Sequence, residues 1–362
     1  MAGAVLAGGA SGASVPHQSR AQGPKLTGVR CLAHCAGARR TTVDGRVRLN
    51  GRHLAAVTEV TFPGEATEVS TPPDRTDRRR VLVTVPAGAQ SGRPTVLTGS
   101  AATARSHERL GIVAASELPD GFKLRKTSVR PRRAFFDQRG AIHARYEFEA
   151  AERTGVRVEV TRGSHVIRTW RHRDQLPFAR ASQAWNGVEG DGDAADDGRY
   201  RFRIGAFGKR SSAAGSVHLY GNRFPVRGPH DYGGAGERFG APRSGGRVHQ
   251  GQDVFAPCGT PLEAARGGRV QAKAYDPVLY GNYVVIDGRK TRADQMYVHM
   301  SSSSRLGDGD RVHTGDRVGS VGNSGNASAE GCQLHFEIWP GGWRRGSPVD
   351  PLPALRRWDG WS

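Results

Sequence analysis

The sequence lacks any apolar run that approaches the ~18–20 residues a membrane-spanning helix needs. No lipid-attachment cysteine follows the N-terminal stretch. A His-Glu-x-x-His helix, a phosphate-binding loop and a dinucleotide fingerprint are also missing. We therefore expect no transmembrane segment, and nothing in the sequence indicates a nucleotide-dependent enzyme.

Cysteine is scarce, with four residues that fall as two pairs, Cys31 with Cys35 and Cys258 with Cys332. An even count in an exported protein is compatible with two disulfides. The stretch Cys31-Leu-Ala-His-Cys35 could instead be half of a metal site. A second half with suitable spacing is missing, so the sequence favours a local disulfide.

The sequence also has few long stretches with the hydrophobic periodicity of an amphipathic helix. Fifty glycines and twenty prolines indicate many short strands and turns. A chain of 362 residues is too long for one ordinary core and suggests two to four domains. We predict a mostly β, multi-domain protein.

Acidic residues are outnumbered, 34 against 53 Lys and Arg, which gives a formal charge of +19. Such a charge implies an anionic partner, for which nucleic acid, anionic wall polymers and a membrane surface are candidates. The arginines are spread along the chain and no nucleic-acid-binding signature accompanies them. We therefore do not expect nucleic acid as a partner.

Residues 1–25 are interpreted as a signal remnant or flexible leader. The stretch MAGAVLAGGASGAS is small and apolar, and Ala13-Ser14 could precede a cleavage site. A positive n-region is missing, so a flexible Ala/Gly tail is the alternative. The pattern favours a secretory origin.

Residues 26–113 show a run of short strands. Val57–Phe62 and Arg80–Val85 are predicted strands, and Asn50-Gly51 is a strong hairpin signal. The spacing suggests a small β-sandwich. The run GRVRLNGRHLAAVTEVTFPG … VLVTVPAGAQSGRPTVLT resembles an IPT/TIG immunoglobulin-like domain.

A linker is predicted at 114–126, followed by a second strand-rich domain at 127–228. Ala144–Glu149 and Val156–Val160 alternate apolar with charged residues, as half-buried strands do. The stretch from Trp185 to Ile204 resembles the hairpin of FlgD-like immunoglobulin-type domains, a likeness of fold only. Its acidic loop could form a calcium site, but the closing Glu of an EF-hand loop is missing, which favours a solvated hairpin tip.

The last predicted domain, 229–362, has short strands separated by glycine turns and no long amphipathic helix. Its proline- and tryptophan-rich tail, from Trp339 to Ser362, is expected to pack back on the domain.

This last domain carries the candidate metal ligands His249, Asp253 and His335. A catalytic zinc site uses three protein ligands of His and carboxylate type and keeps one position for water. His249 and Asp253 can converge from one loop, and His335 lies on a predicted strand whose same face carries Gln333. A His-x-x-x-Asp pair alone is weak evidence among thirteen histidines, but the ordered set with its glycine framework is stronger.

His299 follows another predicted strand and could reach the same cleft. The chemistry that this set indicates is peptide hydrolysis, in which zinc polarises the carbonyl and a nearby His moves protons.

The stretch RFGAPRSGGRVHQGQDVFAPCGTPLEAARGGRV … GNYVVIDG … MYVHM … GDRVGSVGNSGNASAEGCQLHFEIW resembles the lysostaphin/LytM-type zinc endopeptidases of bacterial cell walls. The resemblance covers roughly Arg238 to Pro353. It implies a β-rich fold, a Zn²⁺ cofactor held by His249, Asp253 and His335, and a catalytic His299. It further implies cleavage of peptidoglycan peptides by a secreted or wall-associated protein, whose charge would hold it near anionic wall polymers.

One position departs from the family pattern. Where the family has His-x-His, this chain has Gln333-Leu334-His335, so a catalytic histidine is replaced. Glutamine can donate or accept a hydrogen bond but cannot shuttle a proton. The alternatives are turnover by His299 with Gln333 orienting the oxyanion, and a degenerate domain that binds wall peptides or activates another hydrolase. The sequence does not give the oligomeric state.

Overall fold

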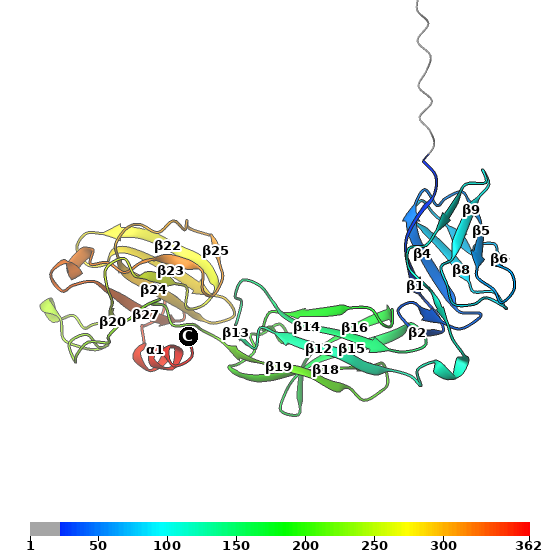
Figure 1. The fold of residues 1–362 in the computed structure, drawn as a ribbon. Coiled ribbons are helices and arrows are strands. Elements are labelled where there is room, and N and C mark those ends of the chain that lie inside the picture. Colours follow the sequence, from blue (N-terminus) through cyan, green and yellow to red (C-terminus); the bar gives the residue numbers. More distant parts are fainter. Residues whose placement is uncertain (1–21) are drawn as a thin grey trace, which may run out of the picture. The chain divides into compact units, whose positions relative to one another are not determined.

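The computed structural model describes residues 22–362, so the predicted leader lies outside the described residues except for 22–25. The described chain is mostly β, as predicted (Figure 1). It divides into two compact units, one containing residues up to Asp120 together with Ala150–Glu152, the other containing Gly121–Glu149 and Arg153–Ser362. Among the described residues, no helix is long and apolar enough to cross a membrane.

The first unit is built from three small sheets. One consists of β1 (Lys25–Cys31), β4 (Arg46–Arg52), β8 (Arg80–Thr84) and β7 (Arg75–Thr76). The second consists of β10 (Thr103–Arg105), β9 (Thr95–Thr98), β5 (Val57–Phe62) and β6 (Val69–Thr71). The third consists of β11 (Gly111–Ile112), β3 (Arg40–Thr41) and β2 (Cys35–Gly37), and a short 3₁₀ helix, η1 (Ala115–Glu117), follows.

The strands predicted at residues 57–62 and 80–85 are present, with apolar side chains turned into one core. The hairpin turn predicted at Asn50-Gly51 is wrong, because β4 continues to Arg52 and Gly51 pairs with Leu26. A Cβ on Gly51 would lie 2.0 Å from the Lys25 carbonyl oxygen, so this glycine permits close approach of β1. Cys31 and Cys35 form the predicted local disulfide.

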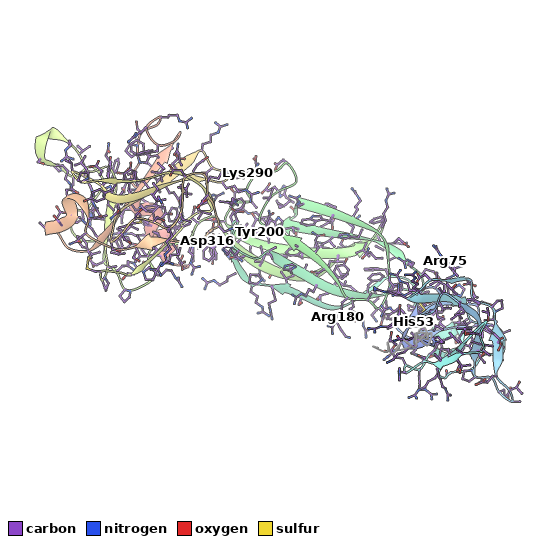
Figure 2. All side chains as sticks on the ribbon, turned by 90° about the horizontal axis from the view of Figure 1, so that it is seen from above. His53, Arg75, Arg180, Tyr200, Lys290 and Asp316 are labelled. Carbon is purple, nitrogen blue, oxygen red and sulfur yellow. A yellow bond between two sulfur atoms is a disulfide. The ribbon has the colours of Figure 1, made fainter. Side chains whose placement is uncertain are left out.

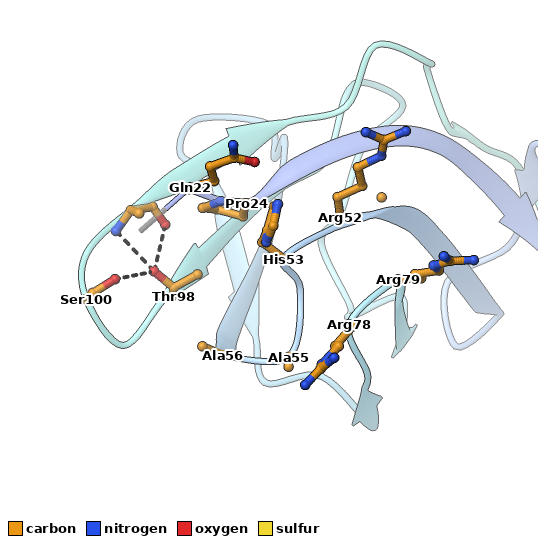
Figure 3. A pocket seen from close by; sticks show the side chains of 13 residues that line it. Gln22, Pro24, Arg52, His53, Ala55, Ala56, Arg78, Arg79, Thr98 and Ser100 are labelled. Atoms are coloured by element: carbon orange, nitrogen blue, oxygen red, sulfur yellow. Dashed lines mark hydrogen bonds between the residues drawn. The ribbon is translucent and has the colours of Figure 1, made fainter. Parts of the chain in front are cut away.

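A hollow of about 790 Å³ lies at one end of the first unit (Figure 3). Its lining includes Arg52, Arg78 and Arg79 together with His53. The three guanidinium groups point away from one another, so they do not form one converging set.

The second unit begins with two packed sheets, here called the two-sheet region (residues 123–220). The smaller sheet consists of β12 (Lys123–Arg130), β14 (Ile142–Glu149) and β17 (Ala181–Trp185). The larger consists of β13 (Arg133–Phe135), β19 (Ser212–Tyr220), β18 (Gly198–Ala206), β15 (Thr154–Arg162) and β16 (His165–Gln175). Trp185 of one sheet lies 5.0 Å from Tyr200 of the other, ring centre to ring centre. Assignment of this region, or of the first unit, to the immunoglobulin-like class stays a prediction.

The C-terminal region (residues 221–362) is organised around one six-stranded sheet. In spatial order its strands are β20 (Gln252–Phe255), β27 (Gln333–Pro340), β24 (Ala293–Met300), β23 (Gly281–Gly288), β22 (Gly268–Asp276) and β25 (Arg311–Val312). A separate pair joins β21 (Pro261–Glu263) to β26 (Arg317–Ser320). Short 3₁₀ helices, η2 (Ser244–Gly246) and η3 (Gly325–Ala329), interrupt the loops.

The two faces of the six-stranded sheet differ. One face forms the main core, where Leu334 and Phe336 of β27 meet Leu355 and Trp358. The last two belong to α1 (Leu352–Asp359), a helix that lies beside β27 in Figure 1. The tail therefore does pack back as predicted, but through a helix that the sequence pattern did not indicate.

The two-sheet region and the C-terminal region contact each other within the second unit. Asp137, which is 6% exposed, forms ion pairs with Arg289 and Arg311. Arg139 donates to both carboxylate oxygens of Asp316, at 2.5 and 2.9 Å; Asp316 is labelled in Figure 2. The contact is therefore charged and partly buried.

Candidate metal centre

Three predicted ligands meet on the open face of the six-stranded sheet. Asp253 of β20 and His335 of β27 are directly opposite each other in the antiparallel register. Side chains on a strand alternate, so Val254, Leu334 and Phe336 enter the core while Asp253 and His335 share the other face. The pairing of these two strands thus places two donors side by side.

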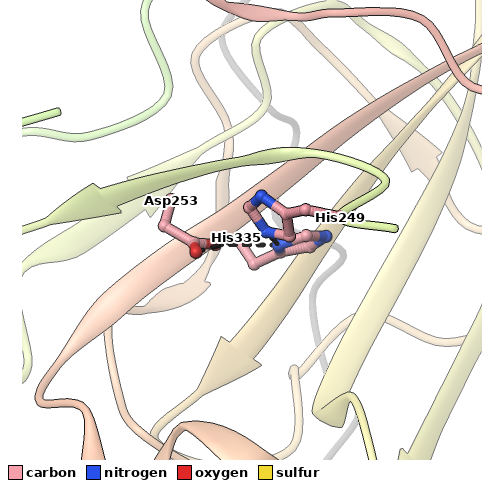
Figure 4. Close-up of side chains that lie close together, drawn as sticks. All are labelled: His249, Asp253 and His335. Atoms are coloured by element: carbon pink, nitrogen blue, oxygen red, sulfur yellow. Dashed lines mark hydrogen bonds and ion pairs between the residues drawn. The ribbon is translucent and has the colours of Figure 1, made fainter. Parts of the chain in front are cut away.

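His249 joins them from the loop before β20 (Figure 4). One donor atom from each of His249, Asp253 and His335 lies within 4.8 Å of the others, and all three residues are buried. His335 Nδ1 is 2.8 Å from both Asp253 Oδ1 and His249 Nε2, and the latter two atoms are 3.2 Å apart. A tetrahedral zinc ion with bonds of about 2.0–2.1 Å requires donor separations of roughly 3.3 Å. Two imidazole nitrogens and one carboxylate oxygen at these distances fit zinc.

Neighbouring groups set the tautomer of each histidine ligand. His249 Nδ1 donates to the Arg238 carbonyl oxygen at 2.9 Å, which leaves Nε2 as the lone-pair donor. His335 Nε2 lies 2.9 Å from Glu337 Oε1, which leaves Nδ1 turned towards Asp253. Such partners on the far nitrogen are typical of metal-binding histidines.

Sequence reasoning assigned no role to Glu337, although it lies two residues after His335. Its side chain is 1% exposed and accepts hydrogen bonds from His335 and from Trp339 Nε1. Side chains alternate along a strand, so every second residue shares a face. The reasoning that placed Gln333 and His335 on one face would therefore have placed Glu337 there as well.

Electrostatics among the protein groups themselves favour a charged cluster. Burial alone would raise the pKa of Asp253, but the contacts of its carboxylate with the imidazoles of His249 and His335 outweigh it and lower that pKa. Burial alone would lower the pKa of His335, but hydrogen bonds to Asp253 and Glu337 raise it to about 10. A proton on His335 Nδ1 thus occupies the position that a metal would take.

Gly251 allows this arrangement. A Cβ at this position would lie 2.7 Å from His335 Nε2 and 2.5 Å from the Phe336 carbonyl oxygen. Real side chains do not pack at such distances, so the His335 ring needs the space that glycine leaves.

His299 lies next to the ligand cluster, with its ring centre 5.8 Å from that of His335. Regular alternation would turn His299 towards the core with Tyr297, but its backbone is left-handed, with φ of 60°. Val298 faces the cleft side while Met300 returns to the core, which shows that alternation breaks at this residue. Non-glycine residues in this conformation are uncommon and cluster at functional sites.

The orientation of His299 is fixed by one backbone contact. Its Nδ1 donates to the Ser324 carbonyl oxygen at 2.8 Å, so Nε2 is the free acceptor. Burial, assisted by the neighbouring His335, lowers the pKa of His299 to about 4. The ring is therefore neutral near pH 7 and able to accept a proton.

Gln333 lies on the cleft face of β27, two residues before His335, and is 1% exposed. Its Nε2 donates to Glu330 Oε2 at 3.3 Å, whereas its Oε1 is buried with no partner among the described residues. The side chain thus offers its unpaired oxygen as an acceptor to a bound molecule, while Glu330 uses one of its two amide hydrogens. Cys258 and Cys332 form the second predicted disulfide, which ties the residue before Gln333 to the loop after β20.

These residues line a cleft of about 730 Å³. Its rim adds Arg243, Arg247, Tyr280 and Glu330. Arg243 Nη2 is 3.5 Å from Asp253 Oδ2, so a cation flanks the carboxylate on the side away from His335. A cleft with polar groups around a buried donor cluster is suited to a peptide.

The buried set of His249, Asp253 and His335 has the donor types that bind a metal ion, and His299 lies next to it. Residues 247–351 are a domain of peptidase family M23.

Curated relatives match part of the chain. A peptidoglycan DD-endopeptidase of Vibrio cholerae, ShyC, is 32% identical over 110 residues, which are 30% of this chain and 24% of the relative. An L-Ala–D-Glu endopeptidase of Bacillus subtilis is 28% identical over 167 residues, 43% of this chain and 49% of the relative. Lysostaphin of Staphylococcus simulans is 28% identical over 111 residues, 31% of this chain and 22% of the relative. The chain therefore spans less than half of the length of each.

Among solved structures, the catalytic domain of Staphylococcus simulans lysostaphin matches 35% of this chain and 92% of its own, at 26% identity and a TM-score of 0.31. A prophage-encoded M23 protein of Enterococcus faecalis, EnpA, matches 36% of this chain and 95% of its catalytic domain, at 34% identity and a TM-score of 0.28.

Proposed function

We propose that this protein is a zinc-dependent endopeptidase that hydrolyses peptide bonds in bacterial peptidoglycan. The observation that carries the proposal is the buried cluster of His249, Asp253 and His335 inside the M23 domain. Two relatives are by name a peptidoglycan DD-endopeptidase and an L-Ala–D-Glu endopeptidase, which supports wall peptides as the substrate class. Two disulfides favour a secreted or wall-associated location.

Each residue has a distinct part in the proposed reaction. A zinc ion held by the three ligands would polarise the scissile carbonyl and lower the pKa of a water molecule. His299 Nε2 accepts a proton in the cleft and returns it to the leaving amine, because the ring is neutral and its other nitrogen is anchored to Ser324. Gln333 positions an N–H or O–H donor through its unpaired oxygen.

We propose the domain division 26–113, 127–228 and 229–362, with 114–126 as a linker whose last four residues already belong to β12. The first two domains would position the peptidase domain or bind partners. Support for the second division is the change from the two-sheet region to the six-stranded sheet after β19.

A second candidate function is a non-catalytic domain that binds wall peptides or activates another hydrolase. Gln333 favours it, because an amide, which cannot shuttle a proton, replaces a proton-shuttling group, and one of its two N–H donors is held by Glu330. Loss of a general acid–base group reduces rates by ~10²–10⁴-fold.

The test combines zinc analysis of the purified full-length protein with an assay for new amino termini in purified peptidoglycan. We expect one zinc per chain and cleavage; His335→Ala should lose both, whereas His299→Ala should keep zinc and lose cleavage. Cleavage that persists in both variants would reject the proposal. Zinc without cleavage, followed by a large gain in Gln333→His, would establish the second candidate.

A further inference from the structure

A second cationic hollow, unrelated to the metal centre, lies at one edge of the two-sheet region. Its volume is about 600 Å³. One wall comes from β12 and the residues just after it, and the other from β18 and β19. Its charged side chains are Arg130, Arg132 and Arg199, the imidazole of His218 lies beside them, and no carboxylate lines it.

The hollow is a built feature of the two sheets. Strand β12 is at the edge of its sheet, and β13 pairs with β19 only over His218–Tyr220, so the edge of β19 before His218 is open. Gly215, with φ of 146°, lets the strands approach, because a Cβ there would lie 2.8 Å from Val129 Cγ2. Two strand edges therefore face each other across the floor of the hollow.

The arginines in this hollow are not neutralised by the protein. Arg130, Arg132 and Arg199 form no ion pair among the described residues. Arg199 Nη2 donates to Ser216 Oγ at 3.2 Å, across the strand pair. The His218 ring stacks on Tyr220, with centres 4.4 Å apart, which holds its edge in place. Unpaired guanidinium groups on two walls form a site for an anion.

The positive charge continues beyond the hollow along β18. Arg199, Arg201 and Arg203 alternate with the buried Tyr200 and Phe202, so their side chains share the outward face at intervals of roughly 7 Å. Across the register, Arg199 is opposite His218 and Arg201 is opposite Ser216, so these strands bring no acidic partner. Glu159, opposite Arg203, is already paired with Arg157 at 2.9 Å. Like charges repeated at this spacing repel one another, and an anion that lies over them relieves the repulsion.

We propose that the hollow and the β18 arginine row bind a phosphodiester polymer of the bacterial wall. Cations from two opposite walls, with the hydroxyls of Thr127, Ser128 and Ser216, suit a tetrahedral phosphate better than a planar carboxylate. The continued row suits a repeating anion. Single-stranded nucleic acid is disfavoured, because Tyr200 and Phe202, the aromatic residues between the arginines, are buried and provide no platform for bases. The choice of a wall polymer rests on the wall-directed function proposed above.

The experiment measures binding of the full-length protein to a synthetic poly(glycerol phosphate), with polyglutamate and a charge-matched single-stranded DNA as comparison ligands. At 0.1–0.15 M salt we expect the phosphate polymer to bind more tightly than the two comparison ligands. Charges more than about 10 Å apart are largely screened at this ionic strength, so long-range attraction to the net charge is weak. The triple variant Arg130→Gln, Arg132→Gln, Arg199→Gln should bind the phosphate polymer about 10–100-fold more weakly. The slope of its log binding constant against log salt concentration should be smaller in magnitude by about 2.

A matched control removes the same charge elsewhere, with Arg52→Gln, Arg78→Gln and Arg79→Gln in the hollow of the first unit (Figure 3). Its affinity should stay within about threefold of the parent, since its guanidinium groups point apart. Equal loss in both triple variants would show that net charge alone binds, and would overturn the site. Tighter binding of DNA or polyglutamate, or no loss in the first variant, would overturn it too. The assay needs neither zinc nor cleavage, so its failure is separate from failure of the proposed function.

Discussion

Glu337 holds the His335 imidazole from the side opposite Nδ1, the nitrogen that faces His249 and Asp253. Its two carboxylate oxygens each accept one hydrogen bond, from His335 and from Trp339. An amide has only one acceptor oxygen, so glutamine would leave one of these buried N–H groups unpaired.

We therefore predict that Glu337→Gln weakens zinc affinity by about 10–100-fold with the fold retained. Competition with a chromogenic chelator measures the affinity, and circular dichroism checks the fold. Glu330→Gln is the control, because that carboxylate lines the same cleft but contacts none of the three ligands. Equal weakening in both variants would assign the effect to cleft charge.

The grouping of His249, Asp253 and His335 could be predicted, because residue type and strand alternation both restrict where ligands lie. Two features could not. The cleft position of His299 was expected, but the left-handed backbone that brings it there was not, because regular alternation would turn this residue to the core. The hydrogen bond that Glu330 receives from Gln333 depends on how η3 folds, which no local pattern specifies.

At the scale of elements, α1 stabilises the sheet that carries the site. Trp358 is 3% exposed and its ring centre lies 6.1 Å from that of Phe336, the neighbour of His335. The helix begins at a proline-rich stretch that reads as a loop, and eight residues are too few for a stable isolated helix. Burial of Leu355 and Trp358 determines it instead, which is why the sequence pattern did not reveal it.

Trp358→Ala should reduce the free energy of unfolding by about 3–5 kcal/mol, because a large ring leaves a cavity in the core. Urea denaturation measures the change. Arg357→Ala, on the exposed side of the same helix, should change stability by less than about 0.5 kcal/mol. A comparable loss in both variants would mean that helix propensity, not burial, matters.

Strand prediction succeeded where burial and propensity agree, as at Val57–Phe62 with its inward Val57, Val60 and Phe62. It failed at Asn50-Gly51, where the local turn signal is overridden by pairing of Gly51 with Leu26 in the neighbouring strand. A dipeptide pattern cannot reveal which distant strand will approach it.

At the scale of the whole molecule, Asp137 joins the two-sheet region to the C-terminal region of the second unit. Its carboxylate is buried between Arg289 and Arg311, which are themselves about one third exposed. Asp137→Asn keeps the shape and removes the charge, so we expect a loss of about 2 kcal/mol and a less cooperative urea transition.

Asp193→Asn, in the exposed loop between β17 and β18, is the matched control and should unfold like the parent. These strands belong to different sheets, so the hairpin predicted there is wrong. If both variants unfold like the parent, Asp137 does not couple the two regions.

The Arg139–Asp316 pair at the same contact predicts a pH dependence. Burial alone would raise the pKa of Asp316 from 3.8, but hydrogen bonds from Arg139 and the His313 backbone outweigh it and lower that pKa. A lowered carboxyl pKa adds stability above 3.8, which is lost as pH falls through the folded value.

Arg139→Gln should therefore lower Tm by about 1–2 °C at pH 7, a small change because the arginine is exposed. The difference should vanish in acid once Asp316 is protonated. Scanning calorimetry of both proteins from neutral to acid pH measures it, and a difference that is constant with pH would argue against the ion pair.

Gly251 has a consequence for interpreting other chains. Because a side chain there would occupy the space of the His335 ring, alanine at this position should expel the ligand while leaving the strands intact. The residue therefore works as a marker: a related sequence that keeps both histidines and the aspartate but has lost this glycine should be a folded protein that no longer holds metal. In an alignment of related sequences, a change at position 251 would indicate loss of metal binding. A change at position 333 alone would indicate loss of a proton-transferring residue with the metal ligands kept.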